Sequence, residues 1–184
     1  MRVVEDEIKR LANLVTEFLD FARPHPLSKR PVEMGPLCER VRGLVAHAAE
    51  AASVQLELDL PDAEVVLDAD PAKLEQVLLN LVGNAIEAAG PGREGAVTLR
   101  VRKHPRFALI EVEDRGIGIA DPRAPLFDPF YSTKQAGTGL GLAIVHRVVT
   151  DHGGSVDFKS GEGTTTFRVT LPLAGWEERI GAMT

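Results

Sequence analysis

The sequence predicts an α/β two-layer sandwich, in which one mixed β-sheet carries helices on one face, preceded by one long N-terminal helix. Stretches that alternate apolar and polar residues, as half-buried strands do, are interleaved with stretches whose apolar residues recur every three to four positions, as in helices. Several of the strand-like stretches follow one another directly as hairpins. The sheet must therefore contain antiparallel neighbours as well as helical crossovers, which defines the mixed class.

The first predicted element is a long helix over residues 1–23, followed by a linker over 24–30 that two prolines define. The apolar residues of this helix follow a heptad spacing: Ile8, Leu11, Val15, Phe18 and Ala22. Further apolar residues widen the stripe beyond what a two-stranded zipper needs. We favour a dimeric helical bundle as its partner, and docking back onto the main domain is the alternative.

The main domain is expected over residues 31–173, with a tail over 174–184. Its predicted elements are a strand at 32–34, a helix at 37–52, strands at 54–60 and 64–68, a helix at 71–89, strands at 96–103 and 107–114, a helix at about 139–152, and strands at 155–160 and 164–173. The helix at 71–89 has the clearest start, because Asp70 is a favourable N-cap and Pro71 a favourable first helical residue.

Composition indicates a globular protein with one main domain. Hydrophobic residues make up 44% and charged residues 26% of the 184 residues, and no apolar run approaches the roughly 18 residues of a membrane span. A net charge of −6 argues against a nucleic-acid partner. The single cysteine, Cys38, excludes an internal disulfide and is interpreted as a small core residue. We expect a cytoplasmic protein, whose full-length form can carry a membrane anchor outside this chain.

Three polar residues stand out in the helix 71–89. Asn80 and Asn84 are four residues apart and share one helix face, and Glu87 follows three residues later. Asparagine is an indifferent helix former, so two of them in an otherwise apolar helix cost stability unless they are used. They are either solvent-facing residues or oxygen ligands aimed into a cleft, where Mg²⁺ would take protein oxygens together with phosphates and water.

Two glycine-rich stretches follow this helix. In the first, Asp114 ends a strand and is followed by Gly116 and Gly118; a carboxylate there can accept a hydrogen bond from an exocyclic amine, although a simple turn is the alternative. In the second, over 137–141, three glycines lead directly into an apolar helix. A helix N-terminus without side chains in the way is a site for phosphate, and a flexible hinge is the alternative.

Taken in order, four stretches closely resemble the nucleotide-binding boxes of the ATP-binding domain of sensor histidine kinases, in the GHKL or HATPase_c superfamily. They are the helix 71–89 (N box), 114-DRGIGI-119 (G1 box), 126-LFDPFYSTK-134 (F box) and 137-GTGLGLAIV-145 (G2 box). Residues 152–172 also resemble that family's final hairpin. Residues 5–24 are similar to the second helix of its dimerisation and phosphotransfer bundle. The resemblance implies the Bergerat-type ATP-binding fold.

The resemblance implies a site for ATP and Mg²⁺. Asn84 would ligate the metal ion, Asp114 would bind the adenine amine directly or through water, Thr165 would lie beside Asp114, and residues 119–137 would form a mobile lid with Phe127 and Phe130 as its apolar anchors. The lid's Lys134 could reach the γ-phosphate. The implied nucleotide-binding residues are Asn84, Ala88, Asp114, Gly116, Gly118, Ile119, Thr138, Gly139, Leu140, Gly141, Leu142 and Thr165. Gly139, Leu140 and Gly141 would offer backbone N–H groups to the phosphates. The implied catalytic residues are Asn80, Asn84, Glu87 and Lys134.

Asn80 separates two kinds of relative. Hydrolytic ATPases of the gyrase and chaperone type carry a glutamate at the matching position, and an amide cannot act as the general base that activates water. The resemblance therefore implies a protein-histidine kinase that transfers the γ-phosphate to a bundle histidine, for relay to the receiver domain of a response regulator. None of the five histidines stands in the family's acceptor string, so we expect the acceptor on a helix absent from this chain. A homodimer through residues 4–22 and a non-enzymatic, ATP-dependent regulator of the anti-sigma type are the further expectations, the second as the alternative function.

Overall fold

The computed structural model describes residues 26–175, with gaps at 91–94, 122, 134–136 and 162. The predicted N-terminal helix, the beginning of the linker, Lys134 and nearly all of the tail lie outside the described residues.

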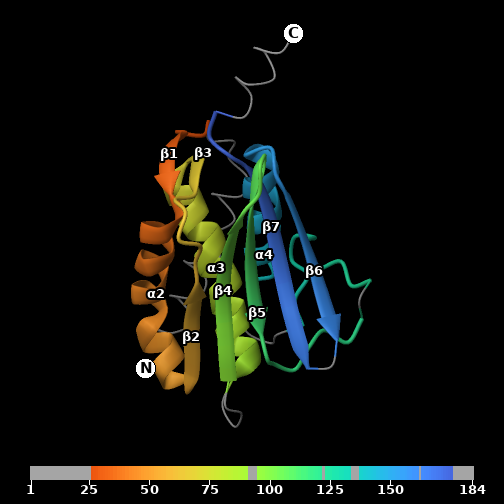
Figure 1. Cartoon of the computed structure of the whole chain (residues 1–184). Helices are drawn as coiled ribbons and strands as arrows, with labels where there is room; N and C mark the ends of the chain where they lie inside the picture. Colours follow the sequence, from red (N-terminus) through yellow and green to blue (C-terminus); the bar gives the residue numbers. More distant parts are fainter. Residues whose placement is uncertain (1–25, 91–94, 122, 134–136, 162, 176–184) are drawn as a thin grey trace, which may run out of the picture.

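A five-stranded mixed sheet forms one layer of the domain, and the helices α2 (Met34–Ala51), α3 (Pro71–Ala89) and α4 (Gly141–Asp151) cover one of its faces (Figure 1). The strands lie in the order β2 (Val54–Asp59), β4 (Gly95–Lys103), β5 (Phe107–Asp114), β7 (Thr164–Pro172) and β6 (Ser155–Gly161). β2 and β4 are parallel, and the other neighbouring pairs are antiparallel. The predicted fold class is confirmed.

A second, two-stranded sheet closes one end of the domain. Its strands β1 (Arg30–Glu33) and β3 (Val66–Ala69) pair antiparallel, and a single bridge joins Leu67 to Leu173 beyond β7. Figure 1 shows this small sheet at the end where the chain leaves β7. It therefore ties the start of the main domain to its last strand.

Local chemistry explains where the helices start. α3 begins and ends as predicted, and the Asp70 carboxylate accepts hydrogen bonds from the N–H groups of Ala72 (3.0 Å) and Lys73 (3.2 Å). α2 starts three residues earlier than expected, because a proline is tolerated in its first turn. α4 starts at Gly141 instead of residue 139, because Gly139 has φ 70°, a left-handed conformation that no helix contains.

The core lies between the sheet and the helices. Alternate residues of β4, β5 and β7 point toward the helices and are buried. The apolar residues predicted to face the core from α3 are all buried: Leu74, Val77, Leu78, Leu81, Val82 and Ala85. Each large aliphatic side chain buried in this way contributes about 1.5–3 kcal/mol. Cys38 is fully buried, and burial together with the nearby Glu39 charge raises the pKa of its thiol to about 12, which confirms its interpretation as a core residue.

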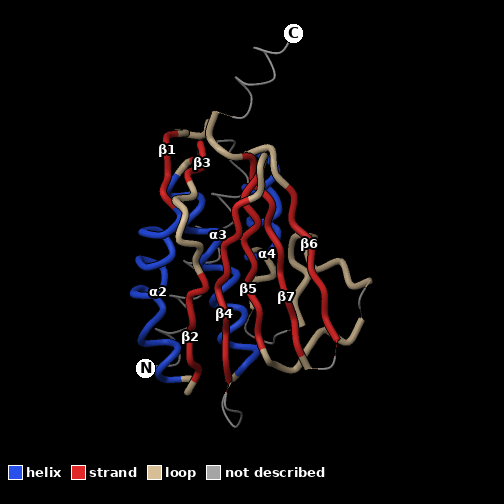
Figure 2. Tube along the Cα trace, viewed as in Figure 1, coloured by secondary structure: helices blue, strands red, loops and turns tan. Residues whose placement is uncertain are grey.

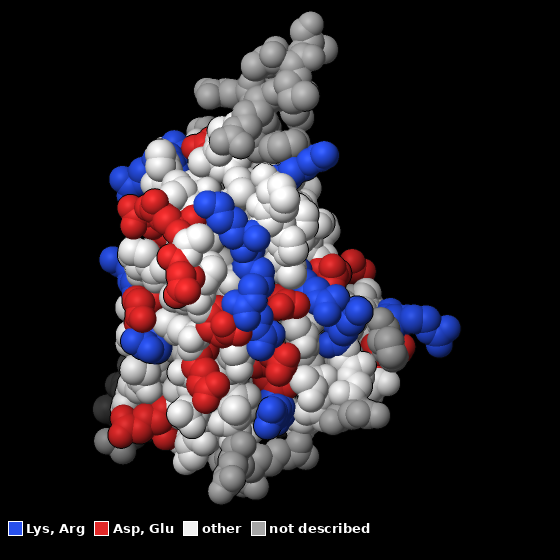
Figure 3. Space-filling view, viewed as in Figure 1, with Lys and Arg blue, Asp and Glu red and all other residues white. Residues whose placement is uncertain are grey.

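The opposite face of the sheet carries a ladder of paired charges (Figure 3). Arg100 and Arg102 of β4 both bind Asp59 of β2, and Arg168 of β7 binds Glu111 of β5 at 3.1 Å. The hydrogen bonds from Arg102 and Arg100 lower the pKa of Asp59 to about 2. Because acids and bases alternate from strand to strand, this face neutralises its own charge.

The connection between β5 and α4 runs beside β6 (Figure 2). Two contacts fix it there: the N–H of Ile119 donates to Ser160 Oγ at 2.8 Å, and the ring of Phe127 lies 6.2 Å from that of Phe158. This path brings the connection, the middle of α3, the start of α4 and the start of β7 around one common space.

Candidate functional site

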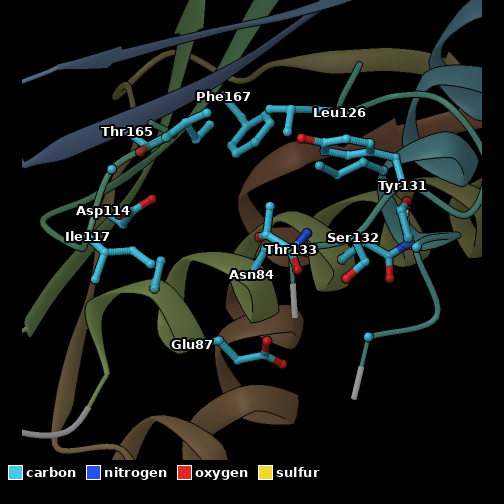
Figure 4. Close-up of a pocket in the computed structure, with 18 of the residues that line it drawn as sticks. Asn84, Glu87, Asp114, Ile117, Leu126, Tyr131, Ser132, Thr133, Thr165 and Phe167 are labelled. Atoms are coloured by element: carbon cyan, nitrogen blue, oxygen red, sulfur yellow. Dashed lines mark hydrogen bonds between the residues drawn. The ribbon is translucent and has the colours of Figure 1, made fainter. Parts of the chain in front are cut away.

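The common space is a cavity of about 370 Å³. Its walls come from α3, the end of β5, described residues of the connection between β5 and α4, the start of α4 and the start of β7 (Figure 4). Most of the residues predicted for the nucleotide site line it: Asn80, Asn84, Glu87, Ala88, Asp114, Gly118, Ile119, Thr138, Gly139, Gly141, Leu142 and Thr165. The fold therefore brings together four stretches that are far apart along the chain.

Asp114 supplies a buried acceptor at one end of the cavity. Its side chain is 3% exposed, and Oδ1 has no hydrogen-bond partner among the residues that the structure describes. Burial raises the pKa of this carboxyl to about 6; the Glu113 charge adds to the rise, and the bond from the Gly116 N–H opposes it. Figure 4 shows the carboxylate pointing into the cavity. A buried oxygen without a partner is costly, so this one fits a ligand that brings a donor.

Gly116 supports that end from behind instead of lining the cavity. A Cβ at this position would lie 2.5 Å from the carbonyl oxygen of Ala88 and 2.6 Å from Asp114 Oδ1. No side chain fits there, so glycine allows the loop after β5 to pack directly on α3. Gly116 thus shapes this end of the cavity through packing, and its contact with a nucleotide stays a prediction.

Thr165 lies next to Asp114, as the resemblance implied. The two residues are paired in the β5–β7 register, and Thr165 is 3% exposed. Thr165 Oγ1 is 3.1 Å from the hydroxyl of Ser160 on β6. Sequence reasoning missed Ser160, because the predicted strands 155–160 and 164–173 would pair it with Thr164, whereas the observed register of β6 and β7 pairs it with Thr165.

The polar residues of α3 line the middle of the cavity. Asn80 and Asn84 share one helix face as predicted, and Asn80 Nδ2 donates to the carbonyl oxygen of Gly141 at 3.2 Å. Glu87 lies at the exposed edge of the cavity, below Asn84 in Figure 4. Glu75 of the same helix forms an ion pair with Arg40 of α2.

The glycine stretch delivers the N-terminus of α4 to the cavity. Gly141 and Leu142 line it, and the first N–H groups of a helix have no acceptor within the helix. Together with the helix dipole, these groups favour an anion such as a phosphate. The Leu140 side chain is fully buried and its N–H donates to Thr138 Oγ1 at 3.3 Å, so in this structure Leu140 does not offer its N–H to the cavity.

Two phenylalanines were expected to anchor the connection through their rings. Phe127 does so: its ring lies 5.7 Å from His146 and 6.4 Å from Phe167. Phe130 is 59% exposed, and its backbone is the anchor instead. Its N–H donates to the Gly139 carbonyl at 3.0 Å, and a Cβ on Gly139 would lie 2.5 Å from the Phe130 carbonyl carbon.

Sequence reasoning did not single out further residues that line the cavity, although five of them lie in the stretches 114–119 and 126–134: Ile117, Leu126, Tyr131, Ser132, Thr133 and Phe167. Phe167 follows from strand alternation two residues after Thr165. The others belong to irregular backbone, where no periodic pattern exists to locate them.

Two further features are absent from the described part of the chain. It contains no cluster of three histidine, cysteine or acidic side chains that could hold a metal ion by themselves. None of its helices combines the length and apolarity that crossing a bilayer requires.

Comparisons with known proteins agree with this geometry. Residues 69–175 match the family described as histidine kinase-, DNA gyrase B- and HSP90-like ATPases. The sensor histidine kinase ZraS of Escherichia coli (strain K12) is 37% identical over 174 residues, which cover 94% of this chain and 37% of ZraS. The catalytic domain of histidine kinase ThkA has a TM-score of 0.72 at 26% identity, covering 79% of this chain and 95% of that one. Full-length ShkA in complex with AMPPNP has a TM-score of 0.81 at 30% identity, covering 94% of this chain and 38% of that one.

The domain is an ATP-binding domain with the fold of histidine kinase catalytic domains. The chain belongs to the family of histidine kinase-, DNA gyrase B- and HSP90-like ATPases, and its curated relatives include sensor histidine kinases. It spans little more than a third of the length of the curated relatives that it matches first.

Proposed function

We propose that this domain transfers the γ-phosphoryl group of ATP to a histidine on a helical bundle, for relay to an aspartate in the receiver domain of a response regulator. One observation supports the proposal above the others. The buried Asp114 oxygen, which has no hydrogen-bond partner among the described residues, and the N-terminus of α4 face the same cavity. The first fits the amine of adenine, and the second fits a phosphate, so the two ends match the two ends of one ATP molecule.

Mg²⁺ would bind between the protein and the phosphates. Magnesium sites for nucleotides typically use one or two protein oxygens, with phosphates and water as the remaining ligands. Asn84 lines the middle of the cavity, between Asp114 and the polar residues Ser132 and Thr133 in Figure 4, and offers an amide oxygen. When bound, the ion neutralises charge on the phosphates. Lys134, which lies outside the described residues, would add a positive charge near the γ-phosphate.

Transfer to a protein is favoured over hydrolysis by the chemistry of α3. Asn80 has no useful basicity, and its amide already binds the Gly141 carbonyl. Glu87 is a carboxylate at the exposed edge of the cavity, where it can orient an incoming acceptor. In the proposed step the acceptor imidazole nitrogen forms a bond to the γ-phosphorus, the bond to the β,γ-bridging oxygen breaks, and ADP leaves. The protein contributes mainly positioning and charge stabilisation.

The acceptor histidine is proposed to come from outside the described domain. His152 is 2% exposed and bonded on both ring nitrogens, and His146 packs against Phe127. Residues 4–22 would form the second bundle helix and a homodimer contact, and the bundle would receive the response regulator.

Transfer of radiolabel tests the proposal directly. The chain is incubated with γ-labelled ATP and a separately supplied bundle fragment that carries the acceptor histidine, with and without Mg²⁺. Acid-labile label on the fragment, dependent on Mg²⁺ and lost in the variant Asp114→Asn, is the expected result. ATP binding without transfer to any bundle fragment would contradict the kinase assignment and favour the non-enzymatic regulator.

A further inference from the structure

Three polar residues form a row across three neighbouring strands at one end of the cavity. Asp114 of β5 pairs with Thr165 of β7, and Thr165 pairs with Ser160 of β6. Directly paired residues point to the same face of a sheet, and here it is the face that the helices cover. Figure 4 shows Asp114 and Thr165 together at this end of the cavity.

The hydroxyl of Ser160 connects this row to the loop after β5. Ser160 Oγ accepts a hydrogen bond from the N–H of Ile119 at 2.8 Å and lies 3.1 Å from Thr165 Oγ1. Its remaining contact, to the Thr164 carbonyl at 3.4 Å, is longer than an ordinary O–H···O bond. Ser160 does not itself line the cavity, whereas Ile119 and Thr165 both do.

The backbone of the loop depends on this hydroxyl at Ile119. Gly118, directly before it, has φ 73° and no side chain, and a Cβ there would meet Ser160 Oγ at 3.4 Å. The Ile119 N–H is half-buried, so without the serine it would lose its partner at a cost in free energy. The Ser160 hydroxyl thus fixes the backbone at Ile119 and also holds the side chain of Thr165 next to Asp114.

We propose that Ser160 is a positioning residue for recognition of the nucleotide base, acting through Ile119 and Thr165. The inference depends on the proposed nucleotide-binding function. A site that reads a base by hydrogen bonds discriminates only when its donors and acceptors are held in fixed places. In this proposal Asp114 accepts a hydrogen bond from the amine of adenine. Ser160 holds Thr165, which lies beside Asp114, and the backbone at Ile119 in one fixed arrangement.

The test compares ATP with inosine triphosphate, which carries a carbonyl oxygen in place of the adenine amine. Affinities are measured by calorimetry with Mg²⁺ for the natural chain and for Ser160→Ala, Ser160→Thr and Ser155→Ala. We expect Ser160→Ala to weaken ATP binding about 3- to 10-fold and inosine triphosphate binding less than about twofold, so that the preference for ATP shrinks. Ser155 is exposed on the same strand, and its replacement should change neither affinity.

Two further outcomes decide the inference. Ser160→Thr retains the hydroxyl and should keep ATP affinity within about twofold of the natural chain. A threonine variant as weak as the alanine variant would overturn the proposal, as would equal loss for both nucleotides, which indicates a merely structural role. Failure of nucleotide binding looks different, because the natural chain would then bind neither nucleotide, and failure of phosphoryl transfer alone would leave these affinities unchanged.

Discussion

The side-chain amide of Asn80 joins two helices at the cavity, because its Nδ2 donates to the carbonyl oxygen of Gly141, 3.2 Å away. Gly141 is the first residue of α4. The bond therefore fixes the start of α4, whose N–H groups are proposed to bind the phosphates, relative to the polar face of α3. An asparagine that is unfavourable in an apolar helix thus has a structural use as well as a proposed catalytic one.

Removing this bond should weaken binding at the phosphate end of the cavity. We expect Asn80→Ala to lower affinity for ATP and for inosine triphosphate by the same factor, about 3- to 10-fold, because the base lies at the other end. Asn80→Asp should cost more, since a carboxylate oxygen would then face the Gly141 carbonyl oxygen. Calorimetry with Mg²⁺ measures both. A loss confined to ATP would show that Asn80 acts on the base instead.

Much of the site was predictable because its residues stand next to strong local signals. Asp70 and Pro71 located the start of α3, helical spacing placed Asn80 and Asn84 on one face, and the end of an alternating strand placed Asp114. These signals depend only on neighbours in the sequence, so they can be recognised without knowledge of the tertiary structure.

Other features depend on contacts that sequence spacing does not reveal. The observed start of α4 lies two residues after the predicted one, because Gly139 packs against the backbone of Phe130 in a left-handed conformation. Phe130 is exposed because its backbone, and not its ring, makes the anchoring contact. Ser160 becomes visible as part of the site only once the register of β6 and β7 is known.

The packing of Gly116 predicts that two glycine-to-alanine substitutions, at Gly116 and at Gly43, change the free energy of unfolding in opposite directions. Gly116→Ala would place a Cβ 2.5 Å from the Ala88 carbonyl oxygen, so the loop or α3 must shift, and we expect a loss of about 1–3 kcal/mol in the free energy of unfolding. Gly43 is exposed within α2, and a Cβ added there would meet no atom within 4 Å, so Gly43→Ala should stabilise the domain by about 0.5–1 kcal/mol. Urea denaturation measures both, and equal effects would contradict the packing argument.

His152 should matter for stability through its contact with the start of α3. Its Nε2 accepts from the Asp70 N–H at 3.0 Å, and its Nδ1 lies 2.7 Å from the Val148 carbonyl oxygen. The ring is 2% exposed, so His152→Ala leaves a cavity and an N–H without its partner. We expect a loss of about 2–4 kcal/mol in the free energy of unfolding.

A matched histidine on the surface provides the control. His47 is exposed on α2, and His47→Ala should change the free energy of unfolding by less than about 0.5 kcal/mol. If His152→Ala were equally mild, the hydrogen bond to Asp70 would contribute little, and α3 would depend on its Asp70 cap alone.

The raised pKa of Asp114 predicts that the free energy of unfolding of the ligand-free domain falls as the pH rises. Burial, with the Glu113 charge, raises its pKa to about 6 in the folded state from its ordinary value of 3.8. Between these two values the folded chain holds a proton that the unfolded chain has released, so the free energy of unfolding decreases as pH increases through this window. Denaturation curves measured across the window should show this trend in the natural chain and a smaller one in Asp114→Asn.

The same ionisation should act on ATP affinity in the opposite direction. The ionised carboxylate is the stronger acceptor for the amine hydrogen bond, so lowering the pH below about 6 should weaken ATP binding, by up to tenfold per pH unit. The phosphates of ATP also titrate, and comparison with Asp114→Asn at each pH removes their contribution because both proteins bind the same ligand. The affinity advantage of the natural chain over the variant should therefore shrink as the pH falls. An advantage that stays constant from about pH 5 to 8 would show that the Asp114 carboxylate does not bind the base in its ionised form.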